Sequence, residues 1–259
     1  MDLSGNIGFA LLLTTLAGLS TGVGGVIAYF IKKPKMIYLA VSLGFSAGVM
    51  IYISFMELMP KAIAAIGEIW GIIAFFIGII VIGVIDMSIP EVKNPHHLKV
   101  PSDSWGTQVD KPIMRVGLFT ALIIAIHNFP EGLATFGAAL TNMKLGIFIA
   151  IAIAIHNIPE GISVSVPIFY ATKNKKKAFI YAFLSGLGEP IGAVIGILFL
   201  LPVLTAEVLS SLLAFAAGIM VYISIDELLP MAHRYGHSHT AIIGIVLGMI
   251  TMAMSLIVL

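Results

Sequence analysis

The sequence has no cysteine and very little charge. Without cysteine it can form neither disulfides nor thiolate metal sites. Only 10% of its 259 residues are charged, whereas about 25% is usual in soluble domains. The net charge of +1, without a clustered basic patch, argues against a nucleic-acid partner. Apolar residues make up 59% of the chain, and the mean hydropathy is +1.07, which is the composition of a protein whose solvent is lipid.

Long apolar runs divide the chain into segments of similar length. Crossing the hydrocarbon core takes about 20 apolar residues. Read between charge clusters and Pro or Gly breaks, the sequence predicts eight spans, at residues 7–31, 36–59, 68–89, 114–138, 145–170, 178–201, 206–230 and 240–258. We therefore expect an all-α membrane protein in which residues 1–259 form a single transmembrane domain with a cytoplasmic loop at 90–113. Because the start carries only Asp2 and no cationic segment, we expect no cleaved signal peptide.

The basic residues predict the orientation of these spans. Of the 14 Lys and Arg residues, only Lys61 and Lys144 fall on one side of the predicted membrane. Cytoplasmic loops keep Lys and Arg, so the other side is predicted to be the cytoplasm. Eight spans leave both termini on the same side. We therefore expect a multi-pass protein of the cell membrane, an inner membrane where there are two, with both termini outside the cytoplasm.

Two stretches of the sequence repeat each other. Residues 47–54 (AGVMIYIS) match 217–224 (AGIMVYIS), and ELMP at 57–60 matches ELLP at 227–230. A weaker similarity links residues 18–27 with 186–195. Spans 1–3 therefore resemble spans 6–8. Since five crossings separate the starts of the two units, the copies enter the membrane in opposite directions, which is the inverted-repeat plan of many transporters.

The two central spans each carry the same polar hexapeptide, HNFPEG at 127–132 and HNIPEG at 156–161. A charged side chain at the centre of a membrane helix costs about 2.5 to 3.5 kcal/mol on insertion scales, so packing alone does not explain it. Residues four apart share a helix face, which pairs each histidine with its glutamate. If the turn between the antiparallel spans centres near residues 143 and 144, His127 is level with Glu160 and Glu131 with His156, within about 6 Å of height.

Imidazole and carboxylate together form a ligand set for zinc, iron, manganese and cobalt, while the absence of sulfur argues against Cu(I). Pro130 and Pro159 each strip a helical carbonyl of its hydrogen-bond donor, and such carbonyls in a membrane must face protein, water or an ion. Span 6 contributes a third buried acid, Glu189, beside glycines at 188, 192 and 196 that allow a neighbouring helix to approach closely. Without Lys or Arg at this depth, these acids need protons or a divalent cation.

These features together resemble the ZIP family of metal transporters, and within it the bacterial ZupT-like branch. The resemblance covers essentially the whole chain. It implies a 3+2+3 helix arrangement with the inverted repeats around the central pair, a homodimer in the lipid bilayer, and alternating access by an elevator or rocking motion. It also implies uptake of zinc toward the cytoplasm, with iron, manganese, cobalt or cadmium as further substrates and no catalytic cofactor.

The resemblance also implies a ligand set for a mid-membrane site with two metal ions, in which Glu131 and Glu160 bridge. One metal would be held by His127, Glu131, His156 and Glu160, and the second by Asn128, Glu131, Asn157, Glu160 and Glu189.

Further polar residues have two interpretations each. Glu57, Asp226 and Glu227 are candidates for the entrance and exit of a metal pathway, and equally for interfacial acids at helix ends. Histidines 233, 237 and 239 either collect released metal or belong to a solvated loop. Asp86 and the pair at 96 and 97 are weaker candidates. The segment STGVGG at 20–25 superficially resembles a nucleotide loop, but its place inside a span favours helix packing through small residues.

Three other functions compete with metal import. An intramembrane metallopeptidase needs a motif such as His-Glu-Xaa-Xaa-His, which is not present. A membrane di-iron oxidase uses Glu-Xaa-Xaa-His pairs, whereas the order here is His-Xaa-Xaa-Xaa-Glu. A metal exporter uses the same coordination chemistry in the opposite direction. We therefore predict a transporter and not an enzyme, with import chosen by the resemblance alone.

Overall fold

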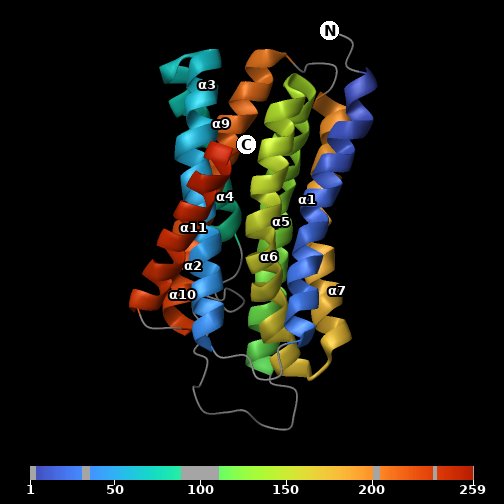
Figure 1. Ribbon diagram of the computed structural model, residues 1–259, viewed down its shortest axis with the longest axis vertical. Coiled ribbons are helices and arrows are strands. Elements are labelled where there is room, and N and C mark those ends of the chain that lie inside the picture. Colours follow the sequence, from blue (N-terminus) through green and yellow to red (C-terminus); the bar gives the residue numbers. More distant parts are fainter. Residues whose placement is uncertain (1–3, 31–35, 89–110, 201–204, 236–237, 259) are drawn as a thin grey trace.

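The structure, a computed structural model, describes residues 4–30, 36–88, 111–200, 205–235 and 238–258. Within these ranges the chain is helical apart from short connections between the helices. Its elements are α1 (Ser4–Phe30), α2 (Met36–Ile53), η1 (Ser54–Leu58), α3 (Met59–Ile66), α4 (Glu68–Met87), α5 (Lys111–Thr141), α6 (Met143–Thr172), α7 (Lys175–Gly186), α8 (Gly188–Ile195), η3 (Gly196–Leu200), α9 (Ala206–Ile223), η5 (Ser224–Leu228), α10 (Leu229–Tyr235) and α11 (Ser238–Val258). The three η segments are π-helical turns. The described helices run roughly along one long axis (Figure 1).

Seven stretches of the described residues are long and apolar enough to cross a membrane, so the chain is a multi-pass membrane protein. They are Ile7–Ile27, Ala40–Ile66, Glu68–Met87, Met143–Phe169, Lys175–Phe199, Ala206–His233 and His239–Ile257. Each overlaps one of the predicted spans. α5, which carries the first hexapeptide, is not among the seven, although it is 31 residues long and packs along α6 (Figure 1). The eighth span therefore stays a prediction.

Two helices continue past the prolines at which the sequence suggested an end. Pro60 lies in the first turn of α3, where a missing backbone N–H costs little. A π-helical turn precedes each proline and lets the helix continue through it. In these turns the N–H of Met59 donates to the carbonyl of Ser54, and the N–H of Leu229 donates to that of Ser224. The helical path thus extends to Ile66 in one repeat and to Tyr235 in the other.

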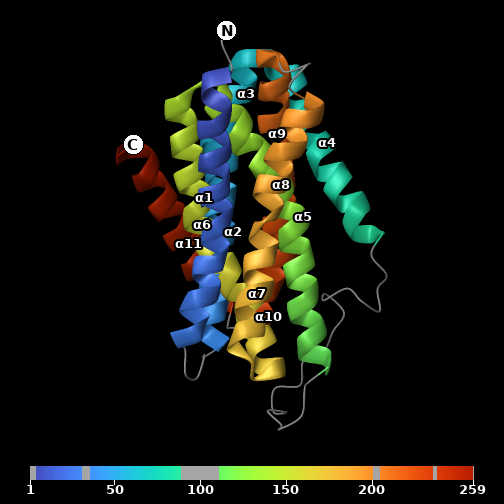
Figure 2. The same ribbon diagram turned by 90° about the vertical axis from the view of Figure 1, so that its right-hand side faces the viewer.

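The helices pack in two groups. The site bundle contains α1, α5, α6, α7 and α8, and the flanking bundle contains α2, α3, α4, α9, α10 and α11 with η1 and η5. Between the bundles, α2 packs on α6 and α9 packs on α5 (Figures 1 and 2). The contacts come in matched pairs under exchange of the two repeats: α1 with α6 corresponds to α8 with α5, and α2 with α11 corresponds to α9 with α4.

Small residues bring α1 and α6 into direct backbone contact. A Cβ added to Gly24 would lie 2.1 Å from the carbonyl oxygen of Ile158, and one added to Gly161 would lie 1.9 Å from that of Thr21. No larger residue fits at either position. The interpretation of the segment at 20–25 as small-residue helix packing is confirmed.

A tight connection sets the register of the central pair. α5 ends at Thr141 and α6 begins at Met143, so a single residue, Asn142, separates them. The Asn142 side chain accepts a hydrogen bond from the N–H of Leu145 at 3.1 Å and caps α6. The turn lies slightly earlier than the sequence predicted, because this cap allows α6 to start at once.

Candidate metal site

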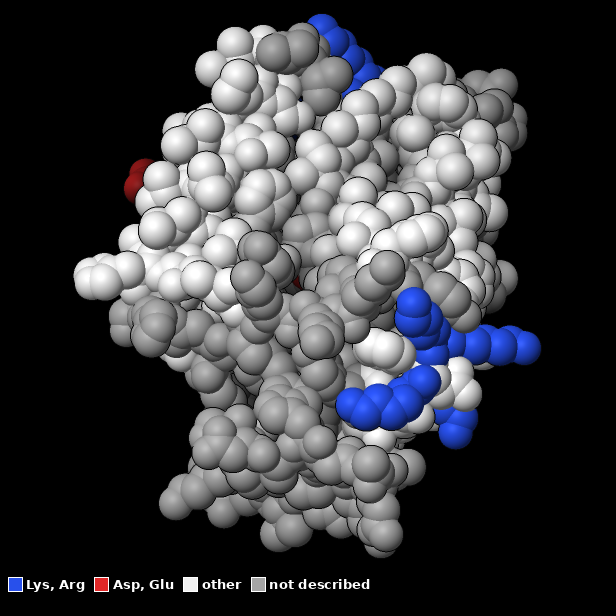
Figure 3. Space-filling view, turned by 60° about the horizontal axis from the view of Figure 1, so that its bottom comes forward, with Lys and Arg blue, Asp and Glu red and all other residues white. Residues whose placement is uncertain are grey.

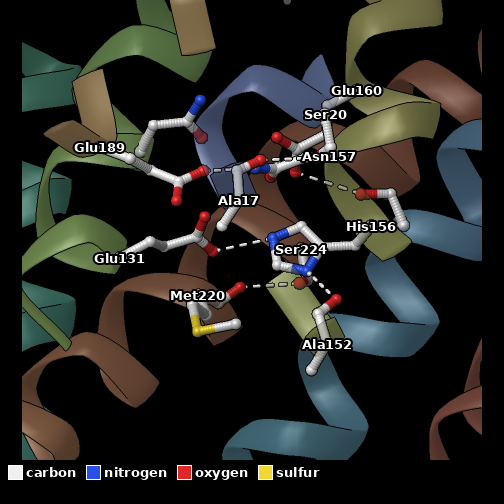
Figure 4. Close-up of polar contacts among 12 residues, drawn as sticks. Ala17, Ser20, Glu131, Ala152, His156, Asn157, Glu160, Glu189, Met220 and Ser224 are labelled. Atoms are coloured by element: carbon white, nitrogen blue, oxygen red, sulfur yellow. Dashed lines mark hydrogen bonds and ion pairs between the residues drawn. The ribbon is translucent and has the colours of Figure 1, made fainter. Parts of the chain in front are cut away.

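Three carboxylates from three helices are buried in the site bundle. Glu131 on α5 is 1% exposed, and Glu160 on α6 and Glu189 on α8 are fully buried. Figure 4 shows the three side chains pointing toward the same region, with His156 and Asn157 of α6 among them. An ionised carboxylate withdrawn from water is stable only when hydrogen bonds and positive charge compensate it. The partners of these acids therefore decide what the site can do.

His156 links α6 to Glu131. Its Nε2 lies 3.0 Å from Oε1 of Glu131, and its Nδ1 lies 3.2 Å from the carbonyl oxygen of Ala152. A neutral imidazole carries one N–H, yet both ring nitrogens here face oxygen acceptors. One of the two contacts therefore lacks a proton, unless the imidazole is protonated or a cation lies between Nε2 and Glu131. A metal satisfies both nitrogens, because Nε2 then acts as its ligand while Nδ1–H donates to the Ala152 carbonyl.

Both asparagines of the hexapeptides are fully buried and use their amide nitrogens as donors. Nδ2 of Asn128 donates to the Ser185 carbonyl at 3.1 Å, and Nδ2 of Asn157 donates to the Ala17 carbonyl at 3.0 Å. Asn157 also donates to Oε1 of Glu189. Among the described side chains, the amide oxygens of both asparagines and Oε2 of Glu189 have no hydrogen-bond partner. These three oxygens are available as hard ligands for a cation.

Glu160 is oriented from the other bundle. The hydroxyl of Ser46, on α2, donates to Oε1 of Glu160 at 3.2 Å, and both residues are fully buried. No local pattern connects Ser46 with the hexapeptides, because 114 residues separate it from Glu160.

The predicted register agrees with the contact between Glu131 and His156. His127 lies on α5, but its side chain is outside the described part of the structure. Among the described side chains, the hexapeptide acids and His156 do not gather within 4.8 Å of one another as a ready-made cluster of three ligands. They form the His156–Glu131 and Asn157–Glu189 pairs, with Glu160 turned to Ser46.

In the part of the chain that the structure describes, the carboxylates that gather this tightly are Asp86, Asp226 and Glu227, whose ligand oxygens lie within 4.8 Å of one another. The hydroxyl of Tyr222 donates to Oδ2 of Asp86 at 3.3 Å. The group borders a small pocket that Ile126 also lines. The volume open to the centre of a water molecule is about 20 Å³, which is enough for one water. Asp86 is a weaker candidate by sequence alone, because only the packing of α4 against α9 brings it to the other two acids.

The remaining candidates lie apart from these groups. Glu57, in η1, forms an ion pair with Lys61, which lies one turn later. His233 is exposed on α10, with its Nδ1 2.8 Å from the Leu229 carbonyl, and His239 is exposed on α11. Residues 96, 97 and 237 are outside the described residues.

Known proteins resemble this chain along almost its whole length. The family model described as ZIP Zinc transporter matches residues 88–256. The chain is 51% identical over 278 aligned positions to a zinc transporter ZupT of Clostridium perfringens, covering 99% of this chain and 98% of the relative. It is 53% identical to a protein of the same name from Chlorobaculum parvum, covering 98% and 99%, and 50% identical to one from Streptococcus mutans, covering 96% of each. The chain therefore belongs to the ZIP zinc transporter family.

Proposed function

We propose that this chain transports zinc across the membrane toward the cytoplasm through the two hexapeptides. The observation that carries the proposal is the burial of Glu131, Glu160 and Glu189 beside partners that are an imidazole, an amide and a hydroxyl. These partners supply no permanent positive charge. A divalent cation offsets the charge of these acids, and the imidazole of His156 and the carboxylate of Glu131 are both able to bind it.

The proposed site holds two metal ions bridged by Glu131 and Glu160. The proposal rests on donor chemistry: the imidazole of His156 suits zinc, while the amide oxygens of Asn128 and Asn157 with Oε2 of Glu189 form a harder, oxygen-rich set. His127 completes the first set. A harder second set also supports iron, manganese and cobalt as further substrates, while cadmium is proposed from the family resemblance alone.

Alternating access is supported by the division into two bundles. The candidate site is carried by one bundle, and the Asp86, Asp226 and Glu227 group lies in the other. The two approach each other at Ile126, which lines the acidic pocket and directly precedes His127. We infer that a metal ion leaves through this pocket and then passes the exposed histidines 233 and 239. His237, which lies outside the described residues, is proposed to act with them. Glu57, held by Lys61 at the opposite end, is the proposed entrance.

The proposed architecture has eight spans in one transmembrane domain, with α5 as the eighth. The matched contacts of the two repeats favour the 3+2+3 inverted-repeat arrangement around α5 and α6. The exposed lysines at the connection of α6 and α7 support a cytoplasmic lower face and termini outside (Figure 3). We also propose a homodimer, as the family resemblance implies.

The test is metal-resolved flux in proteoliposomes of the purified protein. Zinc, iron, manganese, cobalt and cadmium are imposed in turn as gradients in both directions, with the fraction of outward-facing protein measured by labelling. We expect zinc flux that is fastest from the side of the termini. Faster flux from the lysine-rich side would indicate an exporter, and metal-dependent turnover of a substrate without flux would indicate a membrane metalloenzyme.

A further inference from the structure

We propose that Ser46 is a positioning residue of the metal site, which holds Glu160 in place from the flanking bundle. The inference rests on the proposed function, since it assigns Glu160 to the metal. The Ser46 hydroxyl donates to Oε1 of Glu160 at 3.2 Å, and neither side chain is exposed. The hydrogen bond fixes the orientation of the Glu160 carboxylate, and with it the direction in which its second oxygen faces a cation.

The two faces of α2 explain why Ser46 can act as a fixed point. Gly44 and Gly48 lie four residues apart on one face, and both meet the backbone of α11: an added Cβ would lie 2.4 Å from the Ala241 carbonyl oxygen and 2.1 Å from that of Ile245. Ser46 lies two residues from each, about 200° round the helix. Close packing on α11 thus holds α2 on one face while Ser46 reaches α6 from the other.

The hydroxyl of Ser46 departs from the pattern of its neighbours. Serine and threonine in an apolar helix usually donate to a carbonyl of their own preceding turn. Thr14 does so at Ala10, and Ser165 does so at Ile162. Ser46 instead donates to a carboxylate on another helix, which is the stronger type of hydrogen bond.

This hydrogen bond also differs from the others described at the site by joining the two bundles. Asn128 donates to α7 and Asn157 donates to α1 and α8, all within the site bundle. The contact between Ser46 and Glu160 runs from α2 to α6. Movement of one bundle along the other must therefore break it. Ser46 orients the ligand only while the bundles have the placement seen here.

The repeat provides an internal comparison. Residue 216 occupies the position in the second repeat that corresponds to Ser46, and it is alanine, 1% exposed. Its helix, α9, packs on α5 as α2 packs on α6. The two repeats therefore differ in a hydroxyl at the same point of their contact with the central pair. A hydroxyl therefore holds Glu160 from α2, and α9 has no hydroxyl at the corresponding position.

The test compares four variants by zinc uptake into proteoliposomes over a range of zinc concentrations. Ser46→Ala should raise the KM for zinc about tenfold, the lower end of the effect of losing a hydrogen bond to a metal ligand, and change kcat less than twofold. Ser46→Thr, which keeps the hydroxyl, should stay within twofold of wild type. Ser165→Ala is the matched control and should not change KM. Ser46→Ala with Ala216→Ser should stay impaired, because the hydroxyl is then on the wrong side.

A role for Ser46 in packing alone predicts the opposite order, because threonine adds a methyl group where alanine fits easily. A wild-type KM in Ser46→Ala, or a Ser46→Thr variant as impaired as Ser46→Ala, would overturn the inference while zinc uptake by the wild type upholds the proposed function. Absence of uptake by the wild type itself would overturn both.

Discussion

At the scale of single residues, the two asparagines of the site use their two polar atoms differently. Hydrogen bonds hold the amide nitrogens in place, whereas the amide oxygens remain available to bind a cation. Asn157 shows this division. Its amide nitrogen donates to the Ala17 carbonyl and to Glu189, which aims its oxygen in a different direction. Asn128 is held in the same way by Ser185. The donors act as fixed points, and the unpartnered oxygens are where the chemistry is expected.

Glu189 distinguishes the two proposed metals. It belongs to the second ligand set and not to the first, and one of its oxygens bonds to Asn157. Glu189→Gln keeps the volume and removes the charge, so we expect purified protein to bind one zinc per chain where the wild type binds two, and the relative uptake of manganese to fall. Equilibrium dialysis with metal analysis measures this. Two zinc ions per chain in the variant would remove Glu189 from the site.

The same chemistry predicts how transport depends on pH. A histidine must be neutral and a carboxylate ionised to bind metal, and the ordinary pKa of histidine is about 6.5. Protons therefore compete with metal at low pH, and zinc uptake should fall about tenfold or more as the pH on both sides drops from 7 to 5. A flat profile, measured with the free zinc concentration held constant, would mean that protonation of the ligands does not limit transport.

At the scale of helices, backbone contact through glycine positions the acids. A Cβ on Gly192 of α8 would lie 2.2 Å from the carbonyl oxygen of Phe129 on α5, and one on Gly132 of α5 would lie 2.0 Å from that of Glu189. The sequence predicted close packing by span 6 from the glycine spacing, and the contact of α5 with α8 confirms it. The distance between Glu131 and Glu189 is therefore set by two helix backbones.

A methyl group at this contact should separate the helices. Gly192→Ala should cost about 1–3 kcal/mol of stability through overpacking, which lowers the thermal unfolding midpoint by about 5 °C. Gly8→Ala is the matched control, because an added Cβ there meets nothing within 4 Å, and alanine favours a helix over glycine. Equal midpoints for the two variants in the same detergent would contradict close packing at Gly192.

How much the sequence predicted depended on how local the signal was. The spacing of His156 and Glu160, the antiparallel central pair and the level of Glu131 with His156 all follow from helix geometry along a short stretch. Contacts between distant helices did not follow. Asp86 meets Tyr222 across 136 residues, and Ser46 meets Glu160 across 114, so both depend on packing that no periodicity encodes. The π turns before Pro60 and Pro230 were also missed, since proline usually ends a helix.

At the scale of the whole molecule, the account predicts which end faces the cytoplasm. The chain has no cysteine, so a single introduced cysteine reports its own position without background. In intact cells, Asn142→Cys in the exposed turn between α5 and α6 should react with an impermeant maleimide, whereas Asn174→Cys should react only after the membrane is opened. Both positions are exposed and lie outside the proposed site. The reverse pattern would invert the predicted topology and the direction of transport.

The central claim is that the metal crosses the membrane through the buried acids of the two hexapeptides. It is tested most directly by measuring zinc bound to, and zinc carried by, the same preparations of wild type and Glu131→Gln, with Glu207→Gln as a control at an exposed position. We predict that Glu131→Gln elutes as a folded protein, loses bound zinc and shows the uptake of empty liposomes, while Glu207→Gln resembles the wild type. Wild-type zinc uptake by Glu131→Gln would contradict the account.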